Sequence, residues 1–345
     1  MQKHFRKVAK ISLVLVYLVI IAGAVVRMTG SGMGCPDWPK CFGHYIPPTD
    51  VSELQWAPDT EIEKGQIIIV DEKLLVATKD FNTVKTFNHR NWEAYTKHDY
   101  AKFNVAHTWI EYINRLFGAL AGLATLALAL LSIPLYKKNK KVTFLSWLVV
   151  FAMGFQAWLG ATVVYSVLEP VKITVHMVMA LVIVAMLLYI LHAAKNDSNS
   201  YPKSHINILP LVTITLFVTL VQIVLGTQVR QFVDDRIDIV GEAAKNLWLT
   251  GVDWEFYLHR TFSIIVVLLN VFLAQRIYRH QLNFKKINWV LLLLTLEVFT
   301  GIAMYYLDFP FASQPLHLVL ASLLFGVQFY LVLEAISSRK RFKSL

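Results

Sequence analysis

Eight long stretches of apolar residues, separated by polar segments, dominate the pattern along the chain. They lie near residues 11–28, 109–133, 143–165, 172–193, 207–229, 256–277, 287–306 and 315–336. Each is long enough, or nearly so, for a helix to cross the ~30 Å hydrocarbon core of a bilayer, which takes ~20 apolar residues. The pattern therefore predicts an all-α integral membrane protein with eight transmembrane helices.

The longest polar segment, 29–106, separates the first two apolar stretches. Within it, GQIIIVDEKLLVATKDF (65–81) is compatible with a short β-hairpin. The polar stretch around 82–102 is expected to be solvated. We expect no separate soluble domain in this segment, although it holds most of the extramembrane mass.

The second half of the chain repeats motifs of the first half in the same order. GAVVR (23–27) recurs as GTQVR (226–230), YINRLF (112–117) as YLHRTF (257–262), and QAWLGATVVY (156–165) as EVFTGIAMYY (297–306). Gly160 precedes His176 by 16 residues, and Gly301 precedes His317 by the same 16. The repeat predicts two four-helix bundles, 1–198 and 199–345, related by a pseudo-twofold axis along the membrane normal. Because the end of 11–28 recurs inside the chain, that stretch is not expected to be a cleaved signal peptide.

Composition and charge agree with a membrane setting. Hydrophobic residues make up 56% of the chain and charged residues only 16%, with a mean hydropathy of +0.51. Basic clusters lie at the N-terminus, after 109–133, after 256–277 and at the C-terminus. If eight helices cross the membrane, all these clusters lie on one side, which the positive-inside rule makes cytoplasmic. The net charge of +10 is then a matter of topology, and no basic, aromatic-interleaved surface indicates binding to nucleic acid.

The sequence contains two cysteines, Cys35 and Cys41, both in GCPDWPKC. Both lie in the first segment predicted to be outside, where disulfides persist. Their spacing closes a small loop with two prolines, which suits a bridge. Two free thiols or half of a metal site are the alternatives, and the lack of a second CxxC argues against zinc.

Histidines inside predicted membrane helices are the first candidates for chemistry. His259 and His317 each lie within about two turns of the outer end of their helices, and within one bundle they can face each other. Two inward imidazoles on different helices are the usual arrangement for axial ligation of haem in a bundle. His176 recurs at the matching place in the first half. The alternative is a set of interfacial histidines satisfied by water.

Four arginines lie at the predicted outer edge of the membrane, the side that the positive-inside rule disfavours: Arg27, Arg115, Arg230 and Arg260. Guanidinium groups pair well with carboxylates, and haem carries two propionates. Their paired places in the repeat favour propionate contacts over snorkelling at the interface.

One acidic residue breaks the symmetry of the repeat. Glu111 lies one turn before Asn114, whereas its counterpart in the second half is Phe256, and the counterpart of Asn114 is His259. This difference suggests that the first bundle does chemistry while the second holds a fixed cofactor. The alternative is a helix N-terminal carboxylate favoured by the macrodipole. His107 precedes Glu111 by four residues and shares its helical face.

With these residues in place, the chain resembles the haem A synthase family, membrane enzymes that convert haem O to haem A. The resemblance covers nearly the whole chain. It rests on the eight-helix duplication, VVRMTGSGMGCPDWPKC (25–41), EYINR (111–115), LGATVV (159–164), LHR (258–260), His176 and His317.

The resemblance implies a division of labour between the two bundles. Haem b would lie between His259 and His317 in the second, and the substrate haem O would bind in the first with His176 as an iron ligand. Glu111 would be catalytic, assisting successive hydroxylation of the C8 methyl group to a formyl group while haem b carries electrons away. The resemblance further implies a haem O synthase, a farnesyltransferase, as functional neighbour, an electron acceptor of unknown identity, and a location in the cell (inner) membrane with the haem sites toward the outer face.

One position departs from the family motif: the histidine of ExxHR is Asn114 here. Three explanations stay open, namely an open or water-bound iron position, ligation by His107 instead, or a chain that is not catalytic. The main alternative function is therefore a b-type membrane cytochrome that relays electrons from quinol, and a haem carrier or oxidase-assembly factor is a third class.

Overall fold

The computed structural model describes residues 2–98, 102–195 and 206–343, without the side chains of 340–343. Eight long helices account for most of it: α1 (Gln2–Met28), α2 (Val105–Ser132), α3 (Lys140–Tyr165), α4 (Pro170–Ala193), α5 (Leu209–Val240), α6 (Trp254–Arg279), α7 (Ile287–Tyr306) and α8 (Ser313–Lys343). Within the described residues, all eight are long and apolar enough to cross a membrane. The prediction of an all-α membrane protein with eight such helices is confirmed.

The ends of several helices follow from local sequence. The side chain of Asn104 caps α2 by accepting a hydrogen bond from His107 N, and Asn139 caps α3 in the same way through Val142 N. Pro170 occupies the first turn of α4, where its missing N–H costs nothing. Short 3-10 helices punctuate the connections: η1 (Ser31–Met33), η2 (Val51–Leu54), η3 (His89–Asn91), η4 (Ile133–Leu135) and η6 (Lys245–Leu247).

Helix α5 is longer than its apolar stretch predicts. The stretch ends near residue 229, but the helix continues to Val240. Its polar extension contains two pairs with i,i+4 spacing, Arg230–Asp234 and Gln231–Asp235, which support a solvated helix. The helix ends where Gly241 takes a positive φ of 87°, a conformation that glycine adopts readily.

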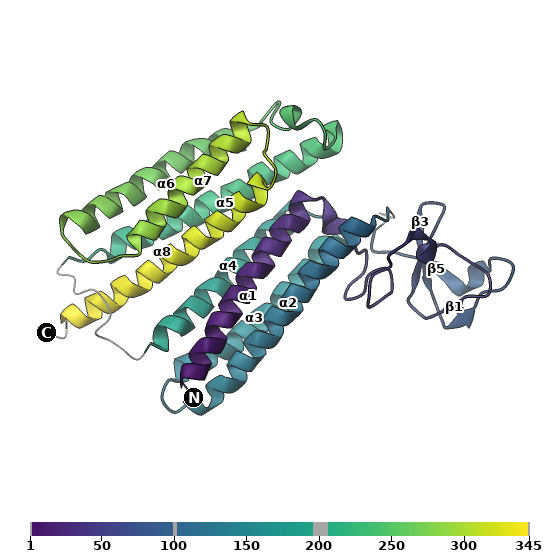
Figure 1. Ribbon diagram of the computed structural model, residues 1–345, viewed down its shortest axis with the longest axis horizontal. Helices are drawn as coiled ribbons and strands as arrows, with labels where there is room; N and C mark the ends of the chain where they lie inside the picture. The colour runs from purple at the N-terminus through teal and green to yellow at the C-terminus, as the bar shows by residue number, and fades with distance from the viewer. Residues whose placement is uncertain (1, 99–101, 196–205, 344–345) are drawn as a thin grey trace.

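The helices pack around two separate hydrophobic cores. Residues of α1 to α4 form one, centred on buried side chains such as Leu128, Val149 and Leu187. Residues of α5 to α8 form the other, around Leu273 and Leu331. Figure 1 shows α1 to α4 in one group and α5 to α8 in another. The pseudo-twofold relation between them stays a prediction, and the predicted boundary at 198/199 lies outside the described residues.

The two groups meet along α1, α4, α5 and α8. There Leu181 of α4, Ile223 of α5 and Phe325 of α8 form a small buried cluster of their own. Near the middle of α1, the hydroxyl of Tyr17 donates to Ser322 O in α8 at 3.4 Å. The halves are therefore joined by direct side-chain packing as well as by the connecting chain.

The segment between α1 and α2 folds into two small antiparallel sheets. One pairs β1 (Glu61–Ile62) with β4 (Phe81–Asn82), and the other has the order β2 (Ile67–Val70), β3 (Lys73–Ala77), β5 (Trp92–Ala94). Asp71 and Glu72 form the two-residue turn between β2 and β3, both with positive φ. The predicted hairpin is confirmed.

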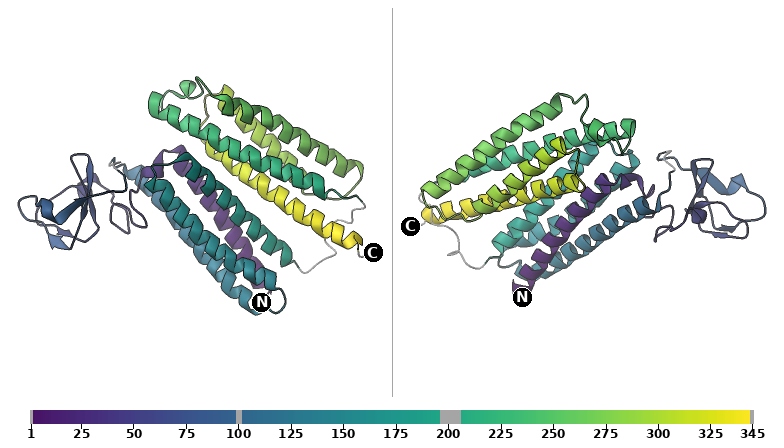
Figure 2. Two further views of the ribbon diagram at one scale, coloured as in Figure 1. Left: turned by 180° about the vertical axis from the view of Figure 1, so that it is seen from behind. Right: turned by 45° about the horizontal axis from the view of Figure 1, so that its top comes forward.

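The part of this segment that was expected to be solvated is mostly exposed, but not throughout. Residues around 82–102 were expected to be solvated, yet β5 pairs with β3 and Trp92 is buried with Ile62, Ile68 and Ala77. Cross-strand burial of an aromatic side chain explains the difference. Figures 1 and 2 show this β region beyond one end of the helices, whereas α1 begins and α8 ends at the other.

Candidate functional site

In each of the helix pairs α1–α2, α3–α4, α5–α6 and α7–α8, a glycine on the first helix faces an asparagine or histidine on the second. A methyl group on the glycine would lie 3.9 Å from Asn114 Oδ1 at Gly23, 3.4 Å from His176 Cε1 at Gly160, 3.1 Å from His259 Cε1 at Gly226 and 3.7 Å from His317 Cε1 at Gly301. These glycines let each polar side chain pack closely against the neighbouring helix. The structure thus places all four residues in one repeated setting near the start of an even-numbered helix.

In the second half, His259 of α6 and His317 of α8 each face a glycine of the preceding helix, and α6 and α8 both pack against α5. His259 contacts the side chain of Gln222 on α5, whose Nε2 lies 3.1 Å from His259 Nδ1 and 3.0 Å from His259 O. The sequence analysis did not identify Gln222. The one feature that could have indicated it is its polar side chain within the apolar stretch 207–229.

His317 is held by two side chains of α7. Its Nδ1 lies 2.8 Å from Thr300 Oγ1 and 3.1 Å from Glu297 Oε2. Glu297 stands out in the sequence as an acid within the apolar stretch 287–306. Its direct contact with the imidazole and the part of Thr300 emerge only from the packing of α7 on α8.

In the first half, the matching polar atoms are less well satisfied. Asn114 Oδ1 and His176 Nδ1 are both buried without a hydrogen-bond partner in the described structure. Gln156 of α3 donates to His176 O at 3.0 Å, so it contacts the backbone and leaves the ring free. Buried polar atoms are nearly always paired in proteins, so these two atoms mark a place that suits a ligand.

Glu111 lies under the loop that contains the cysteines. Its side chain is buried, with Oε2 accepting a hydrogen bond from Cys35 N at 2.8 Å and Oε1 pairing with Arg115 Nη2 at 2.5 Å. Arg115 also donates to Asp37 O and Lys40 O, both at 2.8 Å. The carboxylate and guanidinium of α2 therefore hold this loop over the outer end of the first bundle.

The loop itself is cross-linked and tightly turned. Cys35 and Cys41 form a disulfide with their Cα atoms 4.7 Å apart, so the predicted bridge is confirmed. Asp37 accepts hydrogen bonds from Phe42 N at 2.6 Å and Gly43 N at 2.9 Å. Burial raises the pKa of the Asp37 carboxyl above its usual value. Thr108 of α2 adds a further anchor by donating to Gly34 O at 2.7 Å.

The four candidate propionate arginines have different surroundings. Arg27 of α1 and Arg230 of α5 share Asp234, at 2.8 and 2.6 Å. Arg230 Nη1 is buried without a partner in the described structure. Arg260 is exposed and lies over the rings of Phe256 and Tyr257. Propionate binding stays a prediction for all four, and the pairing of Arg27 and Arg230 with Asp234 is visible only in the structure.

His107 lies near the loop rather than among the other histidines. It is partly buried, and its backbone N–H is bonded to the cap residue Asn104. Its carbonyl group approaches Gly34 so closely that a methyl group there would lie 2.5 Å from His107 O. No contact in the described structure joins its ring to Asn114 or His176, so its proposed part as an iron ligand stays a prediction.

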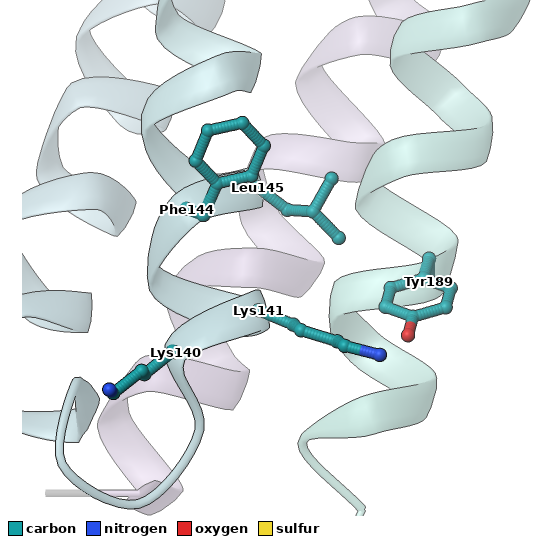
Figure 3. Close-up of a pocket in the computed structure, with 5 residues that line it drawn as sticks. All are labelled: Lys140, Lys141, Phe144, Leu145 and Tyr189. Carbon is teal, nitrogen blue, oxygen red and sulfur yellow. The ribbon is translucent and has the colours of Figure 1, made fainter.

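One surface cavity lies away from all of these residues. Lys140, Lys141, Phe144 and Leu145 of α3 and Tyr189 of α4 line it (Figure 3). Because it is at the start of α3 and near the end of α4, it lies at the opposite end of the helices from Gly160 and His176. It is therefore not part of the candidate site.

Comparisons with known proteins point to one family. A model of the cytochrome oxidase assembly protein family (COX15-CtaA) matches residues 6–97 and 89–329. Heme A synthase of Shewanella oneidensis is 29% identical over 222 residues, which span 63% of this chain and 54% of that protein. Heme A synthase of Ehrlichia canis is 25% identical over 335 residues, spanning 92% and 89%. Heme A synthase of Bacillus licheniformis is 23% identical over 357 residues, spanning 99% of each chain.

Proposed function

The chain belongs to the haem A synthase family, and from that membership we propose that it oxidises the C8 methyl group of haem O to a formyl group. The single observation that carries this proposal is the difference between two equivalent sites. One has two imidazoles, on α6 and α8, that each have a polar partner, and the other has a buried carboxylate one turn from an asparagine in place of a histidine. A duplicated fold with two unlike sites suits an enzyme with a resident cofactor and an exchangeable substrate.

The residues of the second half fit a resident haem b. Nδ1 of His317 faces two oxygen atoms of α7, which leaves Nε2 for iron. Gly226 and Gly301 let the two rings pack closely against α5 and α7. Arg230 has a buried Nη1 without a partner and Arg260 is exposed, so both can take a propionate. When bound, haem b supplies one-electron transfer toward an acceptor whose identity is open.

The residues of the first half suit a haem that enters and leaves. His176 offers one imidazole, whereas Asn114 offers an amide that binds iron poorly. A haem held by one strong ligand and by propionate contacts exchanges faster than one held by two histidines. Asn114 would therefore line the substrate site beside an open or water-bound iron position, with His107 as the alternative ligand.

Glu111 would act at the edge of the porphyrin rather than on its iron. It lies one helical turn, ~5 Å along the axis, from Asn114. Its position is fixed by Cys35 N–H and Arg115, so its oxygens are preorganised to orient water or to accept a proton as the methyl group is hydroxylated. The doubly hydroxylated carbon then loses water to become the formyl group. A haem O synthase would supply the substrate from the same membrane.

One observation favours a second candidate function. Both oxygens of Glu111 are occupied in the structure, which also suits a carboxylate that only anchors the loop. In that case the chain would be a b-type membrane cytochrome that relays electrons from quinol. Pigment extraction separates the two: haem B together with haem O or A supports the synthase, whereas haem B alone supports the cytochrome.

The decisive variant is Glu111→Gln, compared with Thr108→Val. The glutamine keeps an acceptor for Cys35 N–H but removes the charge, whereas the valine removes a loop anchor and leaves Glu111 intact. We expect Glu111→Gln to retain haem b and to stop formation of haem A in cells that also make haem O. Thr108→Val should retain most haem A formation. Normal haem A formation in Glu111→Gln would refute the catalytic role of Glu111. Equal loss of haem A formation in both variants would show that Glu111 only anchors the loop.

A further inference from the structure

The imidazole of His317 donates one hydrogen bond toward two oxygen atoms. Thr300 Oγ1 lies 2.8 Å from Nδ1 and 3.0 Å from the carbonyl oxygens of Leu296 and Glu297, to either of which its hydroxyl can donate. When the hydroxyl donates there, the threonine oxygen is an acceptor toward the ring. Glu297 Oε2 faces Nδ1 at 3.1 Å, and as a carboxylate it can only accept. These two contacts together assign the proton to Nδ1.

A protonated Nδ1 selects one tautomer of the ring. In neutral imidazole only one nitrogen carries hydrogen, so Nε2 is left with its lone pair free. This is the nitrogen that a metal-binding histidine presents when its other nitrogen is bonded to a carboxylate. The side chains of α7 thus prepare His317 for ligation before any iron is bound.

The first half has neither the carboxylate nor the hydroxyl at the matching positions. Glu297 and Gln156 each precede the histidine of the following helix by 20 residues, and Thr300 and Leu159 each precede it by 17. Gln156 donates to His176 O, and His176 Nδ1 has no partner in the described structure. Leu159 has no polar side-chain atom to offer. Of the two halves, only the second therefore has a carboxylate–imidazole pair at this position.

Glu297 has little else to do in the fold. Its side chain is only 13% exposed, and His317 is the partner of its one ion-pair contact in the described structure. Its second oxygen, Oε1, is buried without a hydrogen bond. A carboxyl group in an apolar helix is costly to bury, so a purely structural part would be served better by an apolar residue.

We infer that Glu297 and Thr300 are positioning residues that hold His317 as an Nε2 ligand and set the midpoint potential of the resident haem. This inference rests on the proposed ligation of haem b by His259 and His317. An acceptor on Nδ1 makes the imidazole a stronger electron donor, which stabilises ferric over ferrous iron and lowers the potential. The first half has no such device, in keeping with a haem that is released after oxidation.

The test is a redox titration of the low-spin haem b in the purified full-length protein. Glu297→Leu removes the carboxylate, Glu297→Gln keeps an acceptor, and Thr300→Val removes the hydroxyl without a change in shape. We expect Glu297→Leu to shift the ferric–ferrous equilibrium about tenfold toward ferrous iron, a rise of about 59 mV for one electron. Smaller rises are expected for Glu297→Gln and Thr300→Val. Gln156→Leu, the matched control, should leave this potential unchanged.

The electron paramagnetic resonance spectrum of the ferric haem gives a second readout, because its g-values report how strongly the axial imidazole donates. The g-values should change in Glu297→Leu and remain those of the wild type in Gln156→Leu. If Glu297→Leu fails to bind haem, the other two variants decide the matter through the same measurements. Unchanged potentials in Glu297→Gln and Thr300→Val would overturn the inference.

His317→Met distinguishes failure of the inference from failure of the proposed function. If that variant keeps the low-spin b signal, the assignment of haem b to His317 is wrong, and the inference falls with it. If it loses the signal while the Glu297 and Thr300 variants keep the wild-type potential, haem b is ligated as proposed and only the positioning role is wrong.

Discussion

Asn114 occupies in the first half the position that His259 occupies in the second, and Gly23 faces it as Gly226 faces His259. A methyl group at Gly23 would lie 3.9 Å from Asn114 Oδ1, an ordinary van der Waals distance, so the neighbouring helix leaves room for a larger side chain. The choice of asparagine is therefore not imposed by packing. It changes the chemistry of the site, because an amide is a much weaker ligand of iron than an imidazole.

Asn114→His should convert the substrate site into a second two-histidine site. We expect the bound substrate haem to become low-spin and its transfer to a haem-scavenging apoprotein to slow by at least about tenfold, or ~1.4 kcal/mol. Absorption spectra and the transfer rate measure the two effects. Asn114→Gln is the control, since it adds size without an imidazole. No change in either measurement would show that Asn114 does not face the iron, and His107 would become the better candidate ligand.

The glycines that face the two histidines of the second half are not equally tolerant. A methyl group at Gly226 would lie 3.1 Å from His259 Cε1, tighter than an ordinary contact, whereas one at Gly301 would lie 3.7 Å from His317 Cε1. Alanine raises helix propensity by ~1 kcal/mol at both places, so the difference between the two variants isolates the contact with the ring.

Gly226→Ala should displace the ring of His259 and weaken haem b binding, whereas Gly301→Ala should be nearly neutral. Overpacking of this kind costs ~1–3 kcal/mol. The haem b content and the low-spin absorption bands of the two purified variants measure the outcome. Equal behaviour of the two variants would show that the approach of Gly226 to His259 does not control the position of the ring.

At the scale of elements, the polar extension of α5 forms a clamp onto α1. Asp234 accepts from Arg27 of α1 and from Arg230 of its own helix, and Arg230 Nη2 also donates to Arg27 O at 3.1 Å. The three side chains are only 16–28% exposed, so water screens them incompletely. This cluster therefore joins the C-terminal end of α1 in the first half to the C-terminal part of α5 in the second.

Removal of the shared carboxylate should loosen that clamp. Asp234→Asn leaves two arginines side by side, and we expect a loss of about 1–3 kcal/mol, between the values for exposed and buried ion pairs. Thermal unfolding in detergent measures it. Asp235→Asn is the matched control, because Asp235 accepts only from Gln231 on its own helix in the described structure. A loss of the same size in both variants would contradict the clamp.

At the scale of the whole molecule, α1 begins and α8 ends at the end of the helices opposite the β region (Figure 1). By the positive-inside rule, the basic clusters predict that this end is cytoplasmic. Both candidate sites would then lie toward the outer face, with the loop that contains the disulfide over the first. Substrate, loop and electron acceptor would meet on that side.

Single cysteines test this orientation. Glu72, in the turn between β2 and β3, and Lys138, between α2 and α3, are both exposed. Cys35 and Cys41 form a disulfide and should not react. We expect a membrane-impermeant maleimide to label Glu72→Cys in intact cells and Lys138→Cys only after permeabilisation. The reverse pattern would place the termini and the basic clusters outside.

The sequence was sufficient to predict the eight long helices of this protein and the β-hairpin between the first two. Apolar stretches predicted all eight helices, because a bilayer selects long runs of apolar residues that are visible without any tertiary contact. The short spacing of Cys35 and Cys41 predicted their bridge for a similar local reason. The repeat singled out His176, His259 and His317, since a duplicated chain carries its polar positions at fixed spacing. The hydropathy pattern did not predict the extension of α5, because side-chain pairs rather than apolar residues stabilise the helix as far as Val240.

Only the tertiary structure decided what those residues touch. Glu111 meets Cys35, 76 positions away, and Arg27 meets Asp234, 207 positions away. The bond between Glu297 and His317 depends on which faces α7 and α8 turn toward each other. A helical stretch that is apolar on all sides does not encode its own rotation, and a side chain's partner is set by that rotation. The length and number of helices are therefore local properties, whereas the hydrogen bonds that define the two sites arise when the helices pack.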